Sequence, residues 1–153
     1  MFLLLRKLNR LRRQADLERG PGGSLAVRHV DAGSCNGCES ELNSVANTFY
    51  DLQRFGINIV ASPRHADVLL ITGPVTRRMR EPLLRAYEAM PEPRLVAALG
   101  DCALGCNLLG LPSEHLDGVE SVLHVDVRIE GCPPSPAAIA SALEAALAAG
   151  LGR

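Results

Sequence analysis

Residues 25–39 read LAVRHVDAGSCNGCE, and this stretch decides the fold class of the chain. Leu25 to Val30 is a short run rich in apolar side chains, which is typical of a buried strand. A turn region containing Gly33 follows the run, and Cys35 and Cys38 come directly after it at C-x-x-C spacing. A strand that ends in two thiols predicts a chemical site at the end of that strand.

Outward from this stretch, short apolar runs alternate with segments of helical length. The expected strands are Leu25 to Val30, Ile57 to Ala61, Val68 to Thr72, Leu95 to Leu99 and Val122 to Ile129. The expected helices are Glu39 to Arg54, Thr76 to Met90 and Ala137 to Ala149. We expect one helical turn or irregular structure from Cys102 to Leu116. Alternation of strand and helix predicts an α/β fold, a doubly wound and mostly parallel sheet covered on both faces.

Length and charge limit the classes of function. A chain of 153 residues fits one domain that can bury a core without disulfides. The 16 Lys and Arg against 17 Asp and Glu give a net charge of −1, which argues against a nucleic-acid partner. In a reducing cytoplasm, five cysteines in a chain of this size are expected to be metal or redox ligands.

The first 20 residues differ from the rest of the chain in charge, because they carry six basic and only two acidic side chains. Residues 1–19 place four leucines on one face of an expected basic amphipathic helix, which is either a solvated tail or a segment that docks on a membrane surface or a partner. Gly20 to Gly23 form a linker. We therefore expect an N-terminal segment of residues 1–23 and an α/β domain of residues 24–153. No export signal and no membrane span are expected, so we place the chain in the cytoplasm.

Every cysteine follows the carboxyl end of an expected strand. Cys35 and Cys38 follow the first strand, Cys102 and Cys106 the fourth, and Cys132 the fifth. In a parallel sheet these ends share one edge, where ligands bind. We therefore expect the thiols to converge.

Converging thiolates suit zinc or an iron-sulfur cluster. Structural zinc commonly uses two close pairs of ligands, whereas this chain has one C-x-x-C pair and thiols dispersed over separate loops. The pattern therefore favours a cluster. Cys35, Cys38 and Cys132 are the first three candidates, and Cys102 and Cys106 compete for the fourth place. Cys102 is favoured as the fourth ligand because it lies nearer the strand end. Cys106 is then expected to be a small buried side chain with no ligand role.

Three motifs resemble a known family, the small subunit of nickel-iron hydrogenases together with the 20 kDa subunit of respiratory complex I. They are GSCNGCE at residues 33–39, GDCA at 100–103 and GCPPSP at 131–136. The segment TGPVT at residues 72–76, with Met79, also resembles the complex I subunit.

The resemblance implies a flavodoxin-like domain that holds one 4Fe-4S cluster through Cys35, Cys38, Cys102 and Cys132. The C-x-x-C spacing and the single set of ligands resemble the energy-converting, membrane-associated hydrogenases. One departure is that Cys106 and Asn107 stand where the family commonly has two glycines. This departure leaves Cys106 as an alternative ligand.

The resemblance also implies a function. The chain would be a non-catalytic electron-transfer subunit, peripheral on the inner face of the cell membrane. Its implied partners are a large subunit like the 49 kDa subunit of complex I, a ferredoxin-like iron-sulfur subunit and membrane subunits. One alternative is the cluster subunit of a complex I-like quinone oxidoreductase. Another, of a different class, is a non-redox module that is zinc-stabilised or flavodoxin-like.

Charged residues near the expected site have a chemical role in this interpretation. Asp31, Glu39, Glu41 and Asp101 would lower the potential of a cluster. The four histidines show no metal-ligand spacing and are expected to be strand or surface residues. Arg77, Arg78 and Arg80 are expected to form a solvated helix start or a docking patch.

Overall fold

The computed structural model describes residues 23–106 and 114–151. Within them lies a parallel sheet of order β2-β1-β3-β4-β5. The strands are β1 Leu25–Asp31, β2 Ile57–Ile59, β3 Val68–Thr72, β4 Leu95–Leu99 and β5 Val127–Ile129. This is the strand order of flavodoxin-like folds, so the predicted doubly wound sheet is confirmed.

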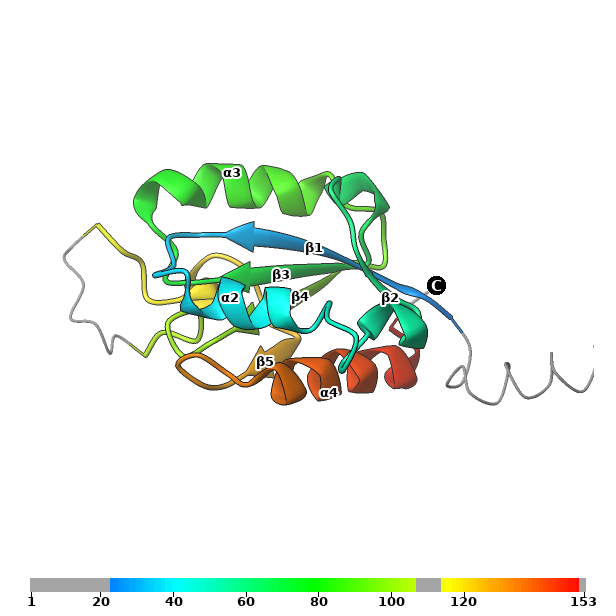
Figure 1. Ribbon diagram of the computed structural model, residues 1–153. Coiled ribbons are helices and arrows are strands. Elements are labelled where there is room, and N and C mark those ends of the chain that lie inside the picture. Colours follow the sequence, from blue (N-terminus) through cyan, green and yellow to red (C-terminus); the bar gives the residue numbers. More distant parts are fainter. Residues whose placement is uncertain (1–22, 107–113, 152–153) are drawn as a thin grey trace, which may run out of the picture.

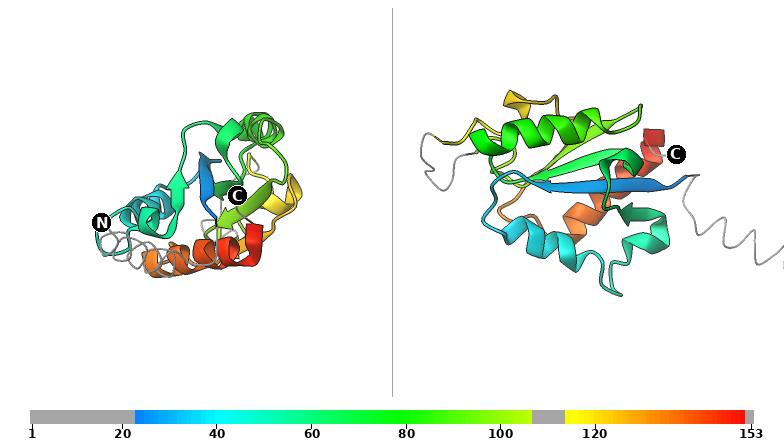
Figure 2. Two further views of the ribbon diagram at one scale, coloured as in Figure 1. Left: turned by 90° about the vertical axis from the view of Figure 1, so that its right-hand side faces the viewer. Right: turned by 90° about the horizontal axis from the view of Figure 1, so that it is seen from above.

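Helices cover both faces of the sheet (Figure 1). The α-helices are α2 Gly37–Ser44, α3 Arg77–Glu88 and α4 Pro136–Ala146, and α4 continues into a π-helical segment, η4 Leu147–Leu151. Helices α2 and α4 lie on one face and α3 lies on the other, as the views of Figure 2 also show. No helix in the described parts of the chain is long and apolar enough to cross a membrane.

Two apolar clusters, one on each face, form the core. Leu42 of α2 and Ile139 of α4 pack against Leu70 of β3 on the first face. On the second face, Leu83 of α3 packs with Leu69 and Ile71 of the same strand. All five residues of β3 are buried because the strand is central and covered on both sides, which is typical of parallel sheets.

Helix α2 ends ten residues earlier than predicted, at Ser44 rather than Arg54. The Asn47 side chain accepts hydrogen bonds from the amides of Phe49 and Tyr50 (2.8 and 3.1 Å), so a turn replaces the helix. A 3-10 turn, η1 Leu52–Phe55, then leads into β2. The helical periodicity after Ser44 comes from buried Val45 and Leu52, which pack on the core from this irregular segment.

Strand β5 starts five residues later than the predicted Val122, at Val127. A short 3-10 helix, η3 Val119–Ser121, precedes it. Val125 is buried in the same apolar cluster as Leu83 of α3 without pairing to a strand, so burial rather than pairing explains the apolar run.

Strand β2 is also shorter than predicted and ends at Ile59. The expected strands β1, β3 and β4 and helix α3 are confirmed to within two residues at each end, and helix α4 to within three.

The segment after β4 is a single helical turn, as predicted for its described part. It ends in a Schellman motif, in which the Gly105 amide donates to the Cys102 carbonyl (3.2 Å) and the Cys106 amide donates to the Asp101 carbonyl (2.8 Å). Gly105 has the left-handed conformation, with φ of 90°, that this motif requires. The predicted N-terminal helix of residues 1–19 lies outside the described residues.

Candidate cluster-binding site

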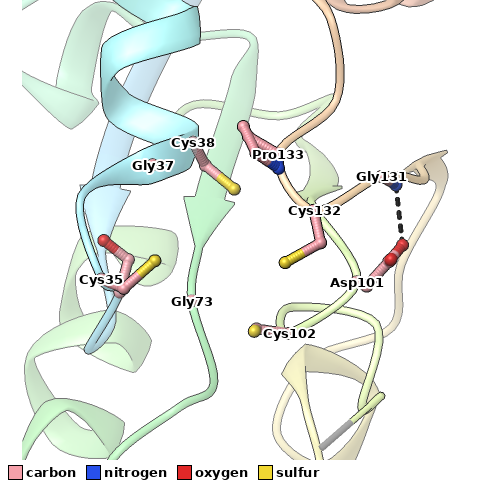
Figure 3. Close-up of a pocket in the computed structure, with 10 residues that line it drawn as sticks. Cys35, Gly37, Cys38, Gly73, Asp101, Cys102, Gly131, Cys132 and Pro133 are labelled. Carbon is pink, nitrogen blue, oxygen red and sulfur yellow. Dashed lines mark hydrogen bonds between the residues drawn. The ribbon is translucent and has the colours of Figure 1, made fainter. Parts of the chain in front are cut away.

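Loops from four strand ends, those of β1, β3, β4 and β5, meet in one pocket at the carboxyl edge of the sheet. The pocket is lined by Ser34, Cys35, Gly37, Cys38, Gly73, Asp101, Cys102, Gly131, Cys132 and Pro133. Figure 3 shows Cys35 and Cys38 on one side of this pocket and Cys102 and Cys132 on the other. The structure therefore brings together the four cysteines that the resemblance implied as ligands.

The loop after β1 is organised by the side chain of Asp31. Its Oδ1 accepts hydrogen bonds from the amides of Gly33 and Ser34, both at 2.8 Å. The Ser34 hydroxyl then accepts from the amide of Asn36 (3.1 Å), which has a φ of 73°. These local bonds turn the chain sharply, so that Cys35 lies just before helix α2 and Cys38 lies in its first turn.

Gly100, just after β4, allows a close approach between two of these loops. A Cβ placed on Gly100 would lie 2.5 Å from the Cys38 sulfur, closer than real Cβ contacts come. Gly100 also has a φ of 90°, which side chains with a Cβ rarely adopt. The sulfur of Cys38 therefore sits directly against the end of β4, and any residue with a Cβ at position 100 would be strained.

The third loop, after β5, carries Cys132. The amide of Gly131 donates to Asp101 Oδ1 at 2.7 Å, which links this loop to the one that carries Cys102 (Figure 3). Pro134 is buried, whereas Cys132 and Pro133 between these two anchors are exposed. Gly37 lies nearby, since a Cβ on it would be 3.9 Å from Pro133. The loops of α2 and β5 thus close the pocket from opposite sides.

Cys106 does not line the pocket. It is the residue that ends the Schellman motif after Cys102, and its side chain is exposed. The sequence-based expectation of a small buried side chain at this position is wrong. The turn that places Cys102 in the pocket carries Cys106 to the solvent.

Burial and neighbouring charges disfavour thiolates in the pocket. The pKa of Cys38 is raised from 9.0 to about 11, mainly by burial and also by the nearby Glu39 and the three other pocket thiols. Burial also raises the pKa of Cys102, with added repulsion from Cys132 and Cys35. Four thiolates here would repel one another, so the pocket suits a group that carries compensating positive charge.

The four thiols come from separate loops rather than from two close pairs. In residues 23–106 and 114–151, no group of three or more His, Cys, Asp or Glu side chains is arranged to hold one metal ion. Four thiols that line one pocket are the donor set of a soft-metal centre.

A buried network beside the pocket was missed by the sequence analysis. Thr72, fully buried at the end of β3, donates its hydroxyl proton to Glu39 Oε1. His29 Nε2 lies 2.9 Å from the same hydroxyl oxygen. Because the Thr72 proton is used for Glu39, this network assigns a proton to His29 Nε2. Burial lowers the pKa of His29 in spite of the nearby Glu39 and Asp31.

Sequence spacing could not reveal this network, because its members come from β1, α2 and β3. His29 is a half-buried strand residue, in line with its expected place. Glu39 Oε2 is buried and has no hydrogen-bond partner among the described residues. The network fastens the first turn of α2, which carries Cys38, to the centre of the sheet.

Comparisons with known proteins agree with this fold and site. The family model described as the 20 kDa subunit of NADH ubiquinone oxidoreductase matches residues 35–146. Formate hydrogenlyase subunit 7 of Escherichia coli is 45% identical over 75% of this chain, which spans only 45% of that protein. A probable membrane-bound hydrogenase subunit, mbhJ of Pyrococcus furiosus, is 42% identical over 84% of this chain and 77% of its own length.

Solved structures show the same architecture. A chain of the membrane-bound sulfane sulfur reductase, an archaeal respiratory membrane complex, is 30% identical with a TM-score of 0.69, covering 89% of this chain and 75% of that one. A chain of an NAD+-reducing nickel-iron hydrogenase has a TM-score of 0.65 at 21% identity, covering 83% and 92%, and shows the fold alone. The extent of the family match and the identity to mbhJ show that this chain belongs to the family of the complex I 20 kDa subunit and the nickel-iron hydrogenase small subunit.

Proposed function

We propose that this chain is an electron-transfer subunit that carries one 4Fe-4S cluster held by Cys35, Cys38, Cys102 and Cys132. The observation that carries the proposal is the convergence of these four cysteines on one pocket from three strand ends. Their dispersal over separate loops, with one C-x-x-C pair rather than two close pairs, supports a cluster rather than a single zinc ion.

The protein side chains supply the binding and the electrostatics of the site. When bound, the cluster accepts and donates single electrons. Thiolates from α2 and from the loops after β4 and β5 hold it from opposite sides. Because Cys38 and Cys102 have raised pKa values without a bound group, loading of the site releases thiol protons.

The names of the relatives support a proposal about the partner subunits of this chain. We propose that the cluster relays electrons to or from the large catalytic subunit of a membrane-associated complex like the nickel-iron hydrogenases. A ferredoxin-like iron-sulfur subunit supplies or removes these electrons, and membrane subunits anchor the complex on the cytoplasmic face. Support comes from relatives named as subunits of formate hydrogenlyase and of a membrane-bound hydrogenase.

A second candidate is the cluster subunit of a complex I-like quinone oxidoreductase. The description of the matching family, a subunit of NADH ubiquinone oxidoreductase, supports it. The C-x-x-C spacing of Cys35 and Cys38 resembles hydrogenases and favours the first candidate. A third candidate is a non-redox zinc or flavodoxin-like module. It is disfavoured because the thiols lie on separate loops rather than in two close pairs, and because two cysteines occupy the loop that would cradle a flavin phosphate.

Purification of the chain without air tests the cluster. We expect a brown protein with four irons and four sulfides per chain, and an electron paramagnetic resonance signal after reduction. Substitution by serine of any one of the four pocket cysteines should abolish or change that signal. Cys106→Ser is the matched control, because Cys106 is exposed outside the pocket, and should retain it. A colourless protein that contains zinc would contradict the proposal.

Purification of the intact complex separates the first two candidates. We expect the complex to evolve hydrogen from a reduced one-electron donor. Electron transfer to a quinone analogue without hydrogen evolution would favour the second candidate instead.

A further inference from the structure

Three aspartates each make the same pair of hydrogen bonds with one residue that lies in a neighbouring strand or just after it. In each pair, the aspartate amide donates to a backbone carbonyl, and the amide of the partner residue donates to the aspartate carboxylate. The pairs are Asp67 with Ala26 (2.8 and 2.9 Å), Asp126 with Val96 (2.9 and 2.8 Å) and Asp101 with Gly131 (2.9 and 2.7 Å). We call each pair an aspartate clamp.

Two of the clamps lie away from the pocket. Asp67 directly precedes β3 and Asp126 directly precedes β5, so both fix the amino ends of strands. The clamp of Asp101 is at the opposite edge, because Asp101 follows β4 and Gly131 follows β5. Strands β4 and β5 are therefore clamped at both ends, and only the clamp at the carboxyl end lies in the pocket.

The Asp101 clamp continues the pairing of β4 and β5 beyond the last residues of the strands. Leu99 pairs with Ile129, and the next amide, that of Gly100, donates to the Ile129 carbonyl at 2.8 Å. Gly131 then leaves the extended path, since its φ is 131° and a Cβ on it would lie 2.6 Å from Pro134 Cα. Its amide is satisfied by the carboxylate of Asp101, as Figure 3 shows.

The clamp fixes the position of one proposed ligand relative to another. Asp101 adjoins Cys102, and Gly131 adjoins Cys132. Cys132 and Pro133 are exposed, so few apolar contacts hold this part of the loop, and its two anchors are buried Pro134 and the clamped Gly131. Loss of the carboxylate removes one of these anchors and leaves the Gly131 amide without its acceptor.

We infer that Asp101 is a positioning residue, which acts through the Gly131 amide to hold the Cys132 thiol at a fixed place opposite Cys102. This inference rests on the proposed cluster. Residues that orient metal ligands commonly contribute about 10- to 100-fold to metal affinity, and Asp101 is expected to act at this level.

The experiment compares three variants of the full chain with the wild type. Asp101→Ala removes the acceptor. Asp101→Asn keeps an oxygen acceptor of the same reach and removes the charge, so that the difference between the two variants isolates the hydrogen bond. Asp126→Ala breaks the equivalent clamp on the same two strands, away from the pocket, and is the matched control for a general loss of stability.

Two readouts are combined. For protein reconstituted without air, we expect Asp101→Ala to hold the cluster at least about tenfold more weakly, with a changed paramagnetic resonance signal. Asp101→Asn and Asp126→Ala should keep the wild-type signal. In the apoprotein, the exchange of the Gly131 amide with solvent should be slow in the wild type and Asp101→Asn and fast in Asp101→Ala.

The experiment distinguishes a failure of the Asp101 inference from a failure of the proposed cluster. Wild-type cluster affinity and signal in Asp101→Ala would overturn the inference, as would equal losses in Asp101→Ala and Asp126→Ala. If Asp101→Ala does not fold, Asp101→Glu, which carries the same charge one methylene further out, must change the signal instead. A wild-type protein that binds no cluster would refute the proposed function, and the amide exchange would still report whether the clamp exists.

Discussion

At the scale of single residues, the pocket combines thiols that disfavour each other's ionisation with glycines that allow the loops to approach. Cys38 is followed in the sequence by an acid, Glu39, and its sulfur lies against the backbone of Gly100. The site is therefore built for a bound group that carries positive charge, and it is strained electrostatically when the thiols lose their protons. Both features lead to measurable consequences.

The stability of the apoprotein should fall at alkaline pH because of Cys38. Its pKa in the folded chain, about 11, lies above the ordinary value of 9.0. Its contribution to the free energy of unfolding is therefore complete below pH 9 and is lost as the pH rises through about 11. The loss should be on the order of 1 kcal/mol, after allowance for solvent screening of a half-buried thiol. Denaturant titrations between pH 8 and pH 11 measure it.

Serine substitutions provide the controls for this prediction. Cys38→Ser should flatten the alkaline decrease, whereas Cys106→Ser, which removes a thiol outside the pocket, should keep it. An identical decrease in all three proteins would contradict the assignment to Cys38.

Gly100→Ala should disturb both the backbone and the Cys38 thiol. The new Cβ would lie 2.5 Å from the sulfur at a φ of 90°, so we expect a loss of about 1–3 kcal/mol in stability and a loss of most of the bound iron. Gly56→Ala is the control, because Gly56 also has a positive φ (82°) but lies at the start of β2, away from every cysteine. Iron content and thermal unfolding of both variants measure the two effects. Full iron content in Gly100→Ala would contradict the prediction.

At the scale of elements, helix α2 depends on contacts with the sheet rather than on its own helical propensity. It has eight residues and no side-chain cap at Asn36. A helix this short is marginal in isolation, and tertiary packing supplies its stability. The network of His29, Thr72 and Glu39 and the burial of Leu42 are the contacts that hold it.

Thr72→Val should loosen α2 by removing the hydroxyl that bridges His29 and Glu39. The variant has nearly the same shape but leaves Glu39 Oε1 without its donor in a buried place, so we expect a loss of about 1–3 kcal/mol in the free energy of unfolding. Thr72→Ser keeps the hydroxyl and should lose less. Denaturant unfolding of the apoproteins measures both, and a smaller loss in Thr72→Val than in Thr72→Ser would show that the methyl group matters more than the hydrogen bond.

At the scale of the whole molecule, the core of the described residues spans both faces of the sheet. Its buried apolar side chains run from Leu25 to Ala146 and form one cluster on each face of the sheet. Each loop of the pocket extends from a strand of this sheet, so the rigidity of the core sets the separation of the thiols. The fold therefore acts as a scaffold whose carboxyl edge carries the chemistry.

The chain should fold without residues 1–22. A variant that begins at Gly23 should keep its unfolding midpoint within a few degrees, because the buried apolar side chains from Leu25 to Ala146 form a cluster on each face of the sheet. Thermal unfolding of the truncated and full chains measures this. A drop of ten degrees or more would contradict the proposed boundary between residues 1–23 and the α/β domain.

Much of the fold follows from local pattern. Central strands such as Val68 to Thr72 are buried on both sides, so their apolar runs are unmistakable in the sequence. Edge strands are shorter and half-exposed, and the predicted bounds of β2 and β5 were too long. The end of α2 was also wrong, because buried Val45 and Leu52 continue a helical spacing through a turn that the Asn47 side chain stabilises.

The sequence by itself determined that the chain is α/β and that its cysteines follow strand ends, because strand periodicity is local and parallel strands place their carboxyl ends along one edge. Only the tertiary structure decided that Cys102 lines the pocket and Cys106 does not, since one turn and a Schellman motif separate them. It alone revealed the aspartate clamps and the His29, Thr72 and Glu39 network. These bonds join residues tens of positions apart, and their partners are chosen by the packing of the sheet rather than by spacing along the chain.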